Sequence, residues 1–156
     1  MTDKDTPYKA PDFSLPNDQG EIKTLADFAG SWLVLYFYPK DETPGCTAQA
    51  CSLRDARDDL TDLGVNILGV SKDSPESHEK FKAKYNLNFT LLSDESGEMI
   101  KEYGAWGSKM FGKEGILRKT YVINPDGFVV KVFDKVTPVG HGEDMLQAIK
   151  ELQASA

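Results

Sequence analysis

Two kinds of hydrophobic pattern alternate along the first half of the chain. Residues 32–38 and 65–70 are almost continuously apolar, as strands covered on both faces of a sheet are. Between them, residues 44–63 carry apolar side chains at the spacing of a helix that packs on one side. A second helix is expected to begin at Ser74-Pro75, a pair suited to a helix N-terminus. This order predicts parallel strands joined by helices.

Shorter patterns complete the order of elements. Because no repeat or long linker interrupts the chain, residues 1–156 are predicted to form a single domain, an α/β three-layer sandwich with a mixed central sheet. In such sheets, sites form beyond the carboxyl ends of the parallel strands. The other expected elements are a hairpin over residues 8–23, a helical turn at 25–28, a strand at 90–92, a short helix near 97–103, a loop over 104–117, a hairpin formed by 118–124 and 128–134, and a final helix over 143–153.

Composition and charge narrow the classes of function. The 156 residues are 40% hydrophobic and 28% charged, which is typical of a soluble globular protein. A net charge of −7 argues against nucleic acid or an anionic membrane surface as a partner. The chain has no apolar run of the roughly 18–20 residues that a membrane span needs, and its polar first residues lack the apolar core of a signal peptide. A cytoplasmic location is therefore expected, where cysteines rarely form permanent disulfides.

Cys46 is the most informative residue because of its position between a predicted strand and a predicted helix. Thr43 is a suitable N-cap and Pro44 suits the first helical position, so Cys46 is expected in the first turn. Unpaired backbone N–H groups and the positive end of the helix dipole favour a thiolate there. Because the thiolate is the nucleophilic form of cysteine, the pattern indicates a reactive thiol.

The second cysteine, Cys51, lies five residues further along the same predicted helix. Cys46 is expected on the buried side and Cys51 on the solvent side. In an intact helix the two α-carbons are separated by about 7.5 Å of rise and about 140° of rotation, hence by roughly 8.5–9 Å. A disulfide requires less than ~7 Å. Either the two thiols never meet, or the first turns unwind after Cys46 reacts so that Cys51 can attack it; we favour the second alternative.

Other candidate residues have ordinary structural explanations. His78 shares a predicted helix face with Phe81, so a packed histidine with hydrogen-bond partners is expected rather than a catalytic base. His141 lies between two glycines and is expected in a loop. The cysteines and histidines lack the spacing of a structural zinc site, which leaves only a metal site assembled by folding as an alternative. Trp106 and Phe111 are expected either to wall a pocket or to pack beneath a loop.

The segment around Cys46 resembles the peroxiredoxins. The pattern Pro39-x-x-x-Thr43-x-x-Cys46 matches their active-site motif, and the second thiol at Cys51 is similar to the bacterioferritin comigratory protein (PrxQ) subfamily. The resemblance covers residues 8–153, with a slightly shorter glycine-rich loop before Arg118 than in many members. Supporting stretches are Ala10-Pro11-Asp12-Phe13, Leu91-Leu92-Ser93-Asp94, Trp106-Gly107 and Arg118-Lys119-Thr120-Tyr121-Val122-Ile123.

This resemblance implies a thioredoxin-like fold and a thiol peroxidase without a metal or organic cofactor. The implied substrates are hydrogen peroxide and alkyl hydroperoxides, and the implied reductant is thioredoxin or a glutaredoxin-type donor. Cys46 would be the peroxidatic cysteine, oxidised to a sulfenic acid. Cys51 would be the resolving cysteine, which forms a transient disulfide with Cys46. Because this resolving thiol lies in the same chain, a monomer is expected.

The resemblance also assigns roles to residues that have simpler explanations. Thr43 would bind the peroxide and the thiolate, and as an N-cap its hydroxyl would accept from a helix N–H. Pro39 would shield the site, although it is also a residue that ends a strand. Gly45 would let the backbone approach the substrate, or would merely ease the turn. Arg118 would complete the pocket and stabilise the departing oxygen, whereas the sequence alone suggests a solvated charge at a strand end.

Two other classes of function remain as alternatives to the peroxidase. A general thiol–disulfide oxidoreductase would use the same fold, but such enzymes usually pair their cysteines as C-x-x-C, whereas four residues separate Cys46 from Cys51. A redox sensor without catalytic turnover would need only an oxidisable Cys46. Peroxide turnover separates both alternatives from the peroxidase.

Overall fold

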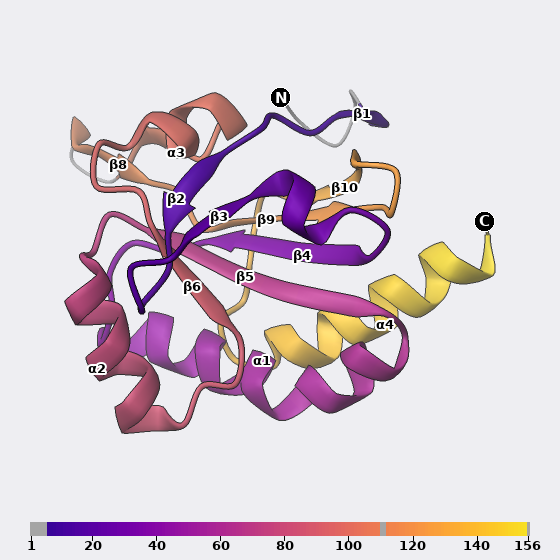
Figure 1. Ribbon diagram of the computed structural model, residues 1–156, viewed down its shortest axis with the longest axis horizontal. Helices are drawn as coiled ribbons and strands as arrows, with labels where there is room; N and C mark the ends of the chain where they lie inside the picture. Colours follow the sequence, from indigo (N-terminus) through magenta and orange to yellow (C-terminus); the bar gives the residue numbers. More distant parts are fainter. Residues whose placement is uncertain (1–5, 110–111, 156) are drawn as a thin grey trace.

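A six-stranded mixed sheet forms the centre of the computed structural model, which describes residues 6–109 and 112–155 (Figure 1). The neighbouring strands β4, β5 and β6 are parallel, whereas β9, β10 and β1 continue the sheet in antiparallel pairs on the other side of β4. The predicted mixed sheet is confirmed. In spatial order, the strands are β1 (Tyr8–Lys9), β10 (Phe128–Phe133), β9 (Lys119–Ile123), β4 (Trp32–Phe37), β5 (Val65–Ser71) and β6 (Thr90–Ser93).

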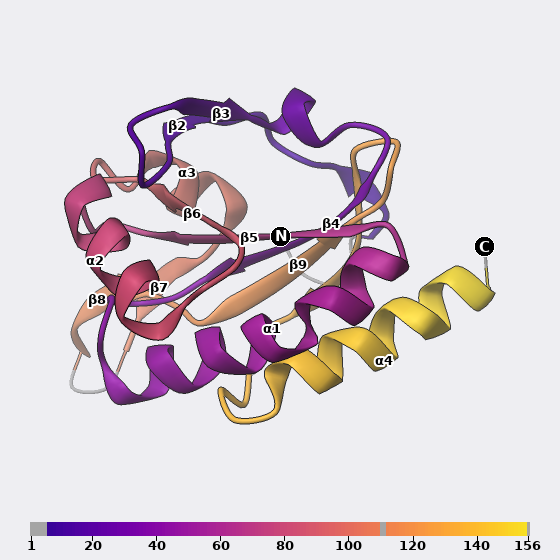
Figure 2. The same ribbon diagram turned by 60° about the horizontal axis from the view of Figure 1, so that its bottom comes forward.

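Helices and a hairpin cover the two faces of this sheet and make the predicted three layers (Figure 2). On one face lie α1 (Pro44–Asp62), α2 (Pro75–Tyr85) and α4 (His141–Ala154), with α1 and α4 packed side by side. On the other face lie the hairpin of β2 (Ser14–Pro16) and β3 (Ile22–Thr24), the 3-10 helix η2 (Leu25–Phe28), and α3 (Glu98–Tyr103).

Strand β4 shows how the sheet divides the core. Because successive side chains of a strand point to opposite faces, Tyr36 packs with Leu53 of α1, whereas Phe37 packs with Ile100 of α3. All four side chains are essentially inaccessible to solvent. The continuous apolar run at residues 32–38 is thus explained by burial on both faces, as predicted.

Two segments differ from the expectation. The predicted loop at 104–117 contains a small antiparallel hairpin, in which Trp106 of β7 (Trp106–Ser108) pairs with Ile116 of β8 (Glu114–Ile116). These strands of three residues are too short to show an alternating pattern. The prediction that His141 lies in a loop is wrong, since α4 begins at this residue, after Gly140 in the left-handed conformation (φ 80°).

The parallel strands end at one edge of the sheet, and the loops that follow them meet there. Strand β4 ends at Phe37, β5 at Ser71 and β6 at Ser93. The segment that joins β4 to α1 therefore begins at this edge, where sites are expected in α/β sheets. Of the helices in the described residues, none combines the length and apolar character that crossing a membrane requires.

Candidate active site

Cys46 lies in the first turn of α1, directly after the carboxyl end of β4, as predicted. Its side chain is buried, with 1% of the residue exposed. Thr43 is the N-cap with extended backbone, and the first helical hydrogen bond runs from the Thr47 amide to the Thr43 carbonyl oxygen at 2.8 Å. The amides of Gly45 and Cys46 precede that bond, so they lie among the N–H groups that a helix leaves without an internal acceptor. This is the position that favours a negative charge.

Arg118 contacts the sulfur of Cys46. Its Nη2 atom lies 3.3 Å from Cys46 Sγ, and its Nη1 atom donates to Gln49 Oε1 at 2.6 Å. The sheet explains this placement, because Lys119 at the start of β9 pairs with Phe37 at the end of β4. The residue before Lys119 is thereby held at the edge where α1 begins. The sequence pattern alone suggested a solvated charge at this position, and that interpretation is wrong.

Gln49 was not recognised in the sequence as part of this group. It is fully buried on α1, three residues after Cys46, which places both side chains on one face of the helix. Its oxygen fixes one arm of the Arg118 guanidinium, while its Nε2 atom has no hydrogen-bond partner within residues 6–109 and 112–155. A polar residue at this spacing from the reactive thiol, on the buried face, is the signal that could have identified it.

Gly45 makes room for the guanidinium. A Cβ atom at this position would lie 3.2 Å from Arg118 Nη2, closer than such contacts usually are. The backbone of Gly45 is helical and needs no left-handed conformation. The missing side chain therefore allows Arg118 to approach the first turn of α1.

Thr43 and Pro39 belong to the segment that leads from β4 into α1. The Thr43 hydroxyl donates to the carbonyl oxygen of Lys40 at 2.8 Å and accepts no hydrogen bond from a helix N–H. The predicted side-chain cap is thus wrong, and the oxygen lone pairs of Thr43 are left to accept a hydrogen bond. Pro39 is half-buried and lines a cavity of about 510 Å³ together with Trp106 and Lys109. Trp106 therefore walls a pocket, whereas Phe111 lies outside the described residues.

Cys51 lies in the second turn of α1 and is half-buried, rather than fully on the solvent side as predicted. The C-terminal end of α2 adjoins this part of α1, because Arg54 Nη1 donates to the Tyr85 carbonyl oxygen at 2.7 Å. The hydrogen bond that Arg54 donates to Asp55 raises the pKa of Arg54, and the nearby Cys51 raises it further. Both thiols are free and α1 is continuous through them.

The surroundings of Cys46 also affect the ionisation of neighbouring groups. Burial raises the pKa of Tyr36 well above its usual value, and the proximity of Cys46 adds to that effect. Partial burial lowers the pKa of Lys109, and the charge of Arg118 lowers it further. Burial and then Arg118 lower the pKa of His141 to about 4, so this imidazole is neutral near pH 7. His141 Nε2 lies 2.9 Å from Thr120 Oγ1.

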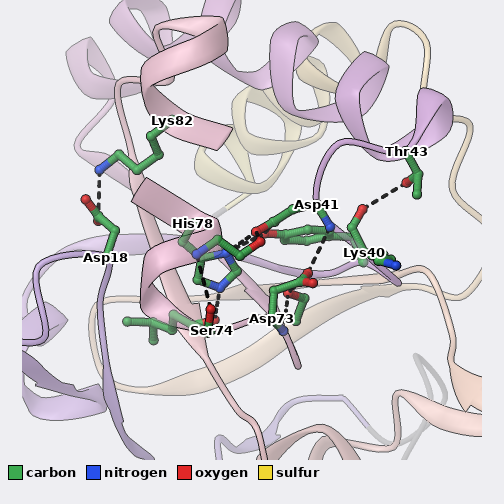
Figure 3. A network of polar contacts seen from close by, with 12 residues as sticks. Asp18, Lys40, Asp41, Thr43, Asp73, Ser74, His78 and Lys82 are labelled. Atoms are coloured by element: carbon green, nitrogen blue, oxygen red, sulfur yellow. Dashed lines mark hydrogen bonds and ion pairs between the residues drawn. The ribbon is translucent and has the colours of Figure 1, made fainter. Parts of the chain in front are cut away.

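His78 is a packed histidine with partners on both ring nitrogens, as predicted. Its Nδ1 atom lies 2.7 Å from Asp41 Oδ2, and its Nε2 atom lies 2.9 Å from the Leu92 carbonyl oxygen (Figure 3). Asp41, Asp73 and His78 each have a potential metal-ligand atom within 4.8 Å of the others. These atoms already take part in hydrogen bonds with protein groups, so the cluster is a satisfied polar network rather than an open set of ligands.

Comparisons with known proteins agree with this geometry. The profile of the AhpC/TSA family matches residues 7–132. Peroxiredoxin Bcp of Escherichia coli K12 is 48% identical over 145 residues, which cover 91% of this chain and 93% of that protein. Peroxiredoxin Bcp of Bacillus subtilis is 45% identical over 147 residues, with coverage of 92% and 94%.

Solved structures give the same result. The bacterioferritin comigratory protein of Xanthomonas campestris, described for its alkyl peroxide reduction activity, superposes with a TM-score of 0.85 at 39% identity, covering 89% of this chain and 90% of that one. A cysteine-to-serine variant of Xylella fastidiosa PrxQ superposes with a TM-score of 0.88 at 32% identity, with coverage of 94% and 98%. The chain therefore belongs to the AhpC/TSA family and is a peroxiredoxin of the Bcp (PrxQ) group.

Proposed function

We propose that this protein is a thiol peroxidase that reduces hydrogen peroxide and organic hydroperoxides through Cys46. The observation that carries the proposal is the guanidinium of Arg118 at 3.3 Å from a buried cysteine sulfur in the first turn of a helix. Helix amides and a permanent cation both favour a thiolate, which is the reactive form. The 48% identity to a peroxiredoxin over most of both chains supports the same reaction.

In the first step, the Cys46 thiolate attacks the terminal oxygen of the hydroperoxide. A sulfur–oxygen bond forms, the oxygen–oxygen bond breaks, and the departing alkoxide or hydroxide takes up a proton to leave as alcohol or water. Negative charge moves from sulfur to the departing oxygen, and a donor fixed along that path lowers the barrier. Arg118 donates at the sulfur and is held in place by Gln49. The Thr43 oxygen accepts from the peroxide hydroxyl, and Pro39 shields the sulfur from water.

In the second step, Cys51 attacks the sulfenic sulfur of Cys46 and displaces the oxygen as water, which leaves an intrachain disulfide. Because both thiols lie in the intact α1, its first turns must unwind before this bond can form. Thioredoxin, or a glutaredoxin-type donor, then reduces the disulfide and α1 winds again.

The protein requires no metal or organic cofactor for this cycle and works as a cytoplasmic monomer with a single domain. A stable dimer in sedimentation at low micromolar concentration would contradict the monomer.

Steady-state turnover tests the reaction and the roles of the two thiols together. Hydrogen peroxide or an organic hydroperoxide is added to the protein with thioredoxin, thioredoxin reductase and NADPH, and NADPH consumption is followed. The unmodified protein is expected to turn over repeatedly, Cys46→Ser to be inactive, and Cys51→Ser to consume one equivalent of peroxide and then stop. Turnover by Cys46→Ser equal to that of the unmodified protein, or rapid insulin reduction with negligible peroxide turnover, would overturn the proposal.

A further inference from the structure

A buried polar network ties the segment between β4 and α1 to the helix α2 (Figure 3). Its centre is Asp41, which is 6% exposed, and His78 of α2, which is fully buried. The two carboxylate oxygens of Asp41 accept from three neighbours: Tyr38 Oη at 2.6 Å, Ser77 Oγ at 2.8 Å and His78 Nδ1 at 2.7 Å. Tyr38 directly follows β4, whereas Ser77 and His78 lie in the first turn of α2. The Asp41 side chain therefore joins the end of β4 to the start of α2.

The hydrogen-bond partners of His78 fix where its protons are. The Leu92 carbonyl oxygen can only accept, so Nε2, at 2.9 Å from it, must carry a hydrogen. The contact between Nδ1 and Asp41 Oδ2 needs a second hydrogen, because a bare imidazole nitrogen and a carboxylate oxygen are both acceptors. The short contact between Nδ1 and Oδ2 therefore joins His78 to Asp41 by a hydrogen bond between two buried side chains.

The backbone of the same segment is held by a second carboxylate. The Asp41 amide donates to Asp73 Oδ2 at 2.8 Å, and the Ser71 hydroxyl donates to the same oxygen at 2.6 Å. The next residue, Glu42, has a φ of 62°, which lies in the left-handed region that residues other than glycine rarely adopt. Such a conformation costs energy and persists where surrounding contacts impose it. The fixed side chain and backbone of Asp41 supply those contacts immediately before Glu42.

The two groups from this segment that take part in the proposed function, Pro39 as a shield and Thr43 as a peroxide ligand, lie on either side of Asp41. Pro39 is two residues before Asp41 and Thr43 is two residues after it. The Thr43 hydroxyl donates to the carbonyl oxygen of Lys40, the residue adjoining Asp41. Holding Asp41 in place therefore sets the direction of that carbonyl and, with it, the direction of the Thr43 lone pairs.

We propose that His78 is a positioning residue of the peroxide site, which acts through its hydrogen bond with Asp41 to hold residues 39–43 in the form that presents Thr43 and Pro39 to the substrate. The inference rests on the proposed peroxidase function. His78 touches neither the substrate nor the sulfur of Cys46. Its effect is on geometry, and a misplacement of about 1 Å in groups that orient a substrate can slow a reaction roughly 100-fold.

The test compares two reactions of the same sulfur in a Cys51→Ser background, where Cys46 is the only thiol. Oxidation by hydrogen peroxide needs the thiolate and the groups that orient the oxygen–oxygen bond, whereas alkylation by iodoacetamide needs mainly the thiolate. The measured quantity is the ratio of the two second-order rate constants. His78→Leu is expected to lower this ratio about 10- to 100-fold. Lys82→Met is the matched control, because it removes another polar contact of α2, the ion pair with Asp18 at 3.1 Å, and is expected to leave the ratio unchanged.

Two further variants separate positioning from a general loss of structure. Asp41→Asn introduces an amide that can donate to Nδ1 of a neutral imidazole while its oxygen accepts from Tyr38, so the ratio is expected to stay within about threefold of the parent. The double variant Asp41→Ala/His78→Leu removes both members of the buried pair, so neither is left without the other. Its loss of stability to urea is expected to be smaller than the sum of the losses in the two single variants, because a lone buried polar group costs more than a removed pair. Its peroxide ratio is expected to remain low.

The outcomes distinguish this inference from the function on which it rests. If the Cys51→Ser parent reacts with peroxide no faster than a free thiol, the proposed function fails. If the parent is fast but His78→Leu keeps the ratio of Lys82→Met, or if the double variant recovers the full ratio, the positioning role of His78 is overturned. A parallel fall of both rate constants in His78→Leu, with the ratio constant, would likewise leave His78 a purely structural residue.

Discussion

The Nη2 atom of Arg118 lies 3.3 Å from the Sγ atom of Cys46, although 72 positions separate the two residues in the chain. The antiparallel pairing of β9 with β4 brings them together, since it sets Lys119 opposite Phe37 at the edge where α1 begins. The contact thus depends on sheet register as much as on the two side chains, and a register shift by one residue would direct the guanidinium away from the thiol.

Arg118→Gln is expected to slow the oxidation of Cys46 by hydrogen peroxide by about 100- to 1000-fold, the usual loss when one donor to a developing charge is removed. Arg118→Lys keeps the charge but cannot bridge Cys46 and Gln49 with a planar fork, so an intermediate rate is expected. Stopped-flow measurement of the reduced protein gives these constants. Equal rates for Arg118→Gln and the unmodified protein would remove Arg118 from the mechanism.

Gly45→Ala is expected to slow the oxidation of Cys46 by peroxide without lowering the free energy of unfolding. The added Cβ would lie 3.2 Å from Arg118 Nη2 and would displace the guanidinium from the thiol, so we expect peroxide oxidation to slow about tenfold. Glycine is unfavourable in a helix by roughly 0.5–1 kcal/mol relative to alanine, so the free energy of unfolding is expected to hold or rise. Urea unfolding and peroxide kinetics on one sample provide the check. A slower reaction that is accompanied by a large loss of stability would contradict this explanation.

Gly142→Ala is expected to destabilise the protein by about 1–3 kcal/mol, as added atoms in a closed packing site do. A Cβ at this position would overlap the Ser52 carbonyl oxygen of α1 and lie 3.0 Å from Ala56 Cβ. It would also disturb the hydrogen bond from the Gly142 amide to Ser52 Oγ at 2.8 Å. Gly115→Ala is the control, because its Cβ would make only ordinary contacts of 3.5 Å or more. Equal urea midpoints for the two variants would refute the close approach of α4 to α1.

His141 is expected to make the protein less stable to unfolding in mild acid. Its pKa is lowered from 6.5 to about 4 in the folded chain, by burial and then by Arg118, so the unfolded chain takes up a proton first. Stability is therefore complete above about pH 6.5 and falls as the pH decreases toward 4, by roughly 3 kcal/mol in all. The variant His141→Gln keeps all carboxylates, but its free energy of unfolding is expected to lack the part of the decrease that His141 causes between about pH 6.5 and 4. Parallel pH dependence of the unfolding free energy in both proteins would contradict it.

The central elements could be predicted from the sequence because their residue types depend directly on whether each position is buried or begins a helix. A strand buried on both faces must be apolar throughout, which located residues 32–38, and an N-cap followed by proline located the start of α1. The hairpin of β7 and β8 escaped prediction because each strand has only three residues. The start of α4 was missed because two glycines flank His141, and the need for Gly142 arises from Ser52 on another helix.

The contacts of the candidate site were predictable where they are local in the sequence and not where they depend on folding. Cys46 and Thr43 lie within one turn of each other, so the residue preferences of a helix N-terminus were enough to predict Thr43 as the N-cap residue and Cys46 in the first turn. Arg118 and Gln49 meet only through the sheet register and the buried face of α1, so no local pattern reveals that contact. The same holds for Asp41 and His78, which are 37 positions apart and became partners only through the packing of α2.

The most direct test of the account is mass mapping of the reduced protein after treatment with one equivalent of hydrogen peroxide. Peptides containing Cys46 and Cys51 are expected to be recovered joined by a disulfide, and in the Cys51→Ser variant Cys46 alone is expected to gain one oxygen. Oxygen on Cys51 with an unmodified Cys46, or thiols that survive the treatment unchanged, would contradict the assignment of Cys46 as the peroxide-reducing residue.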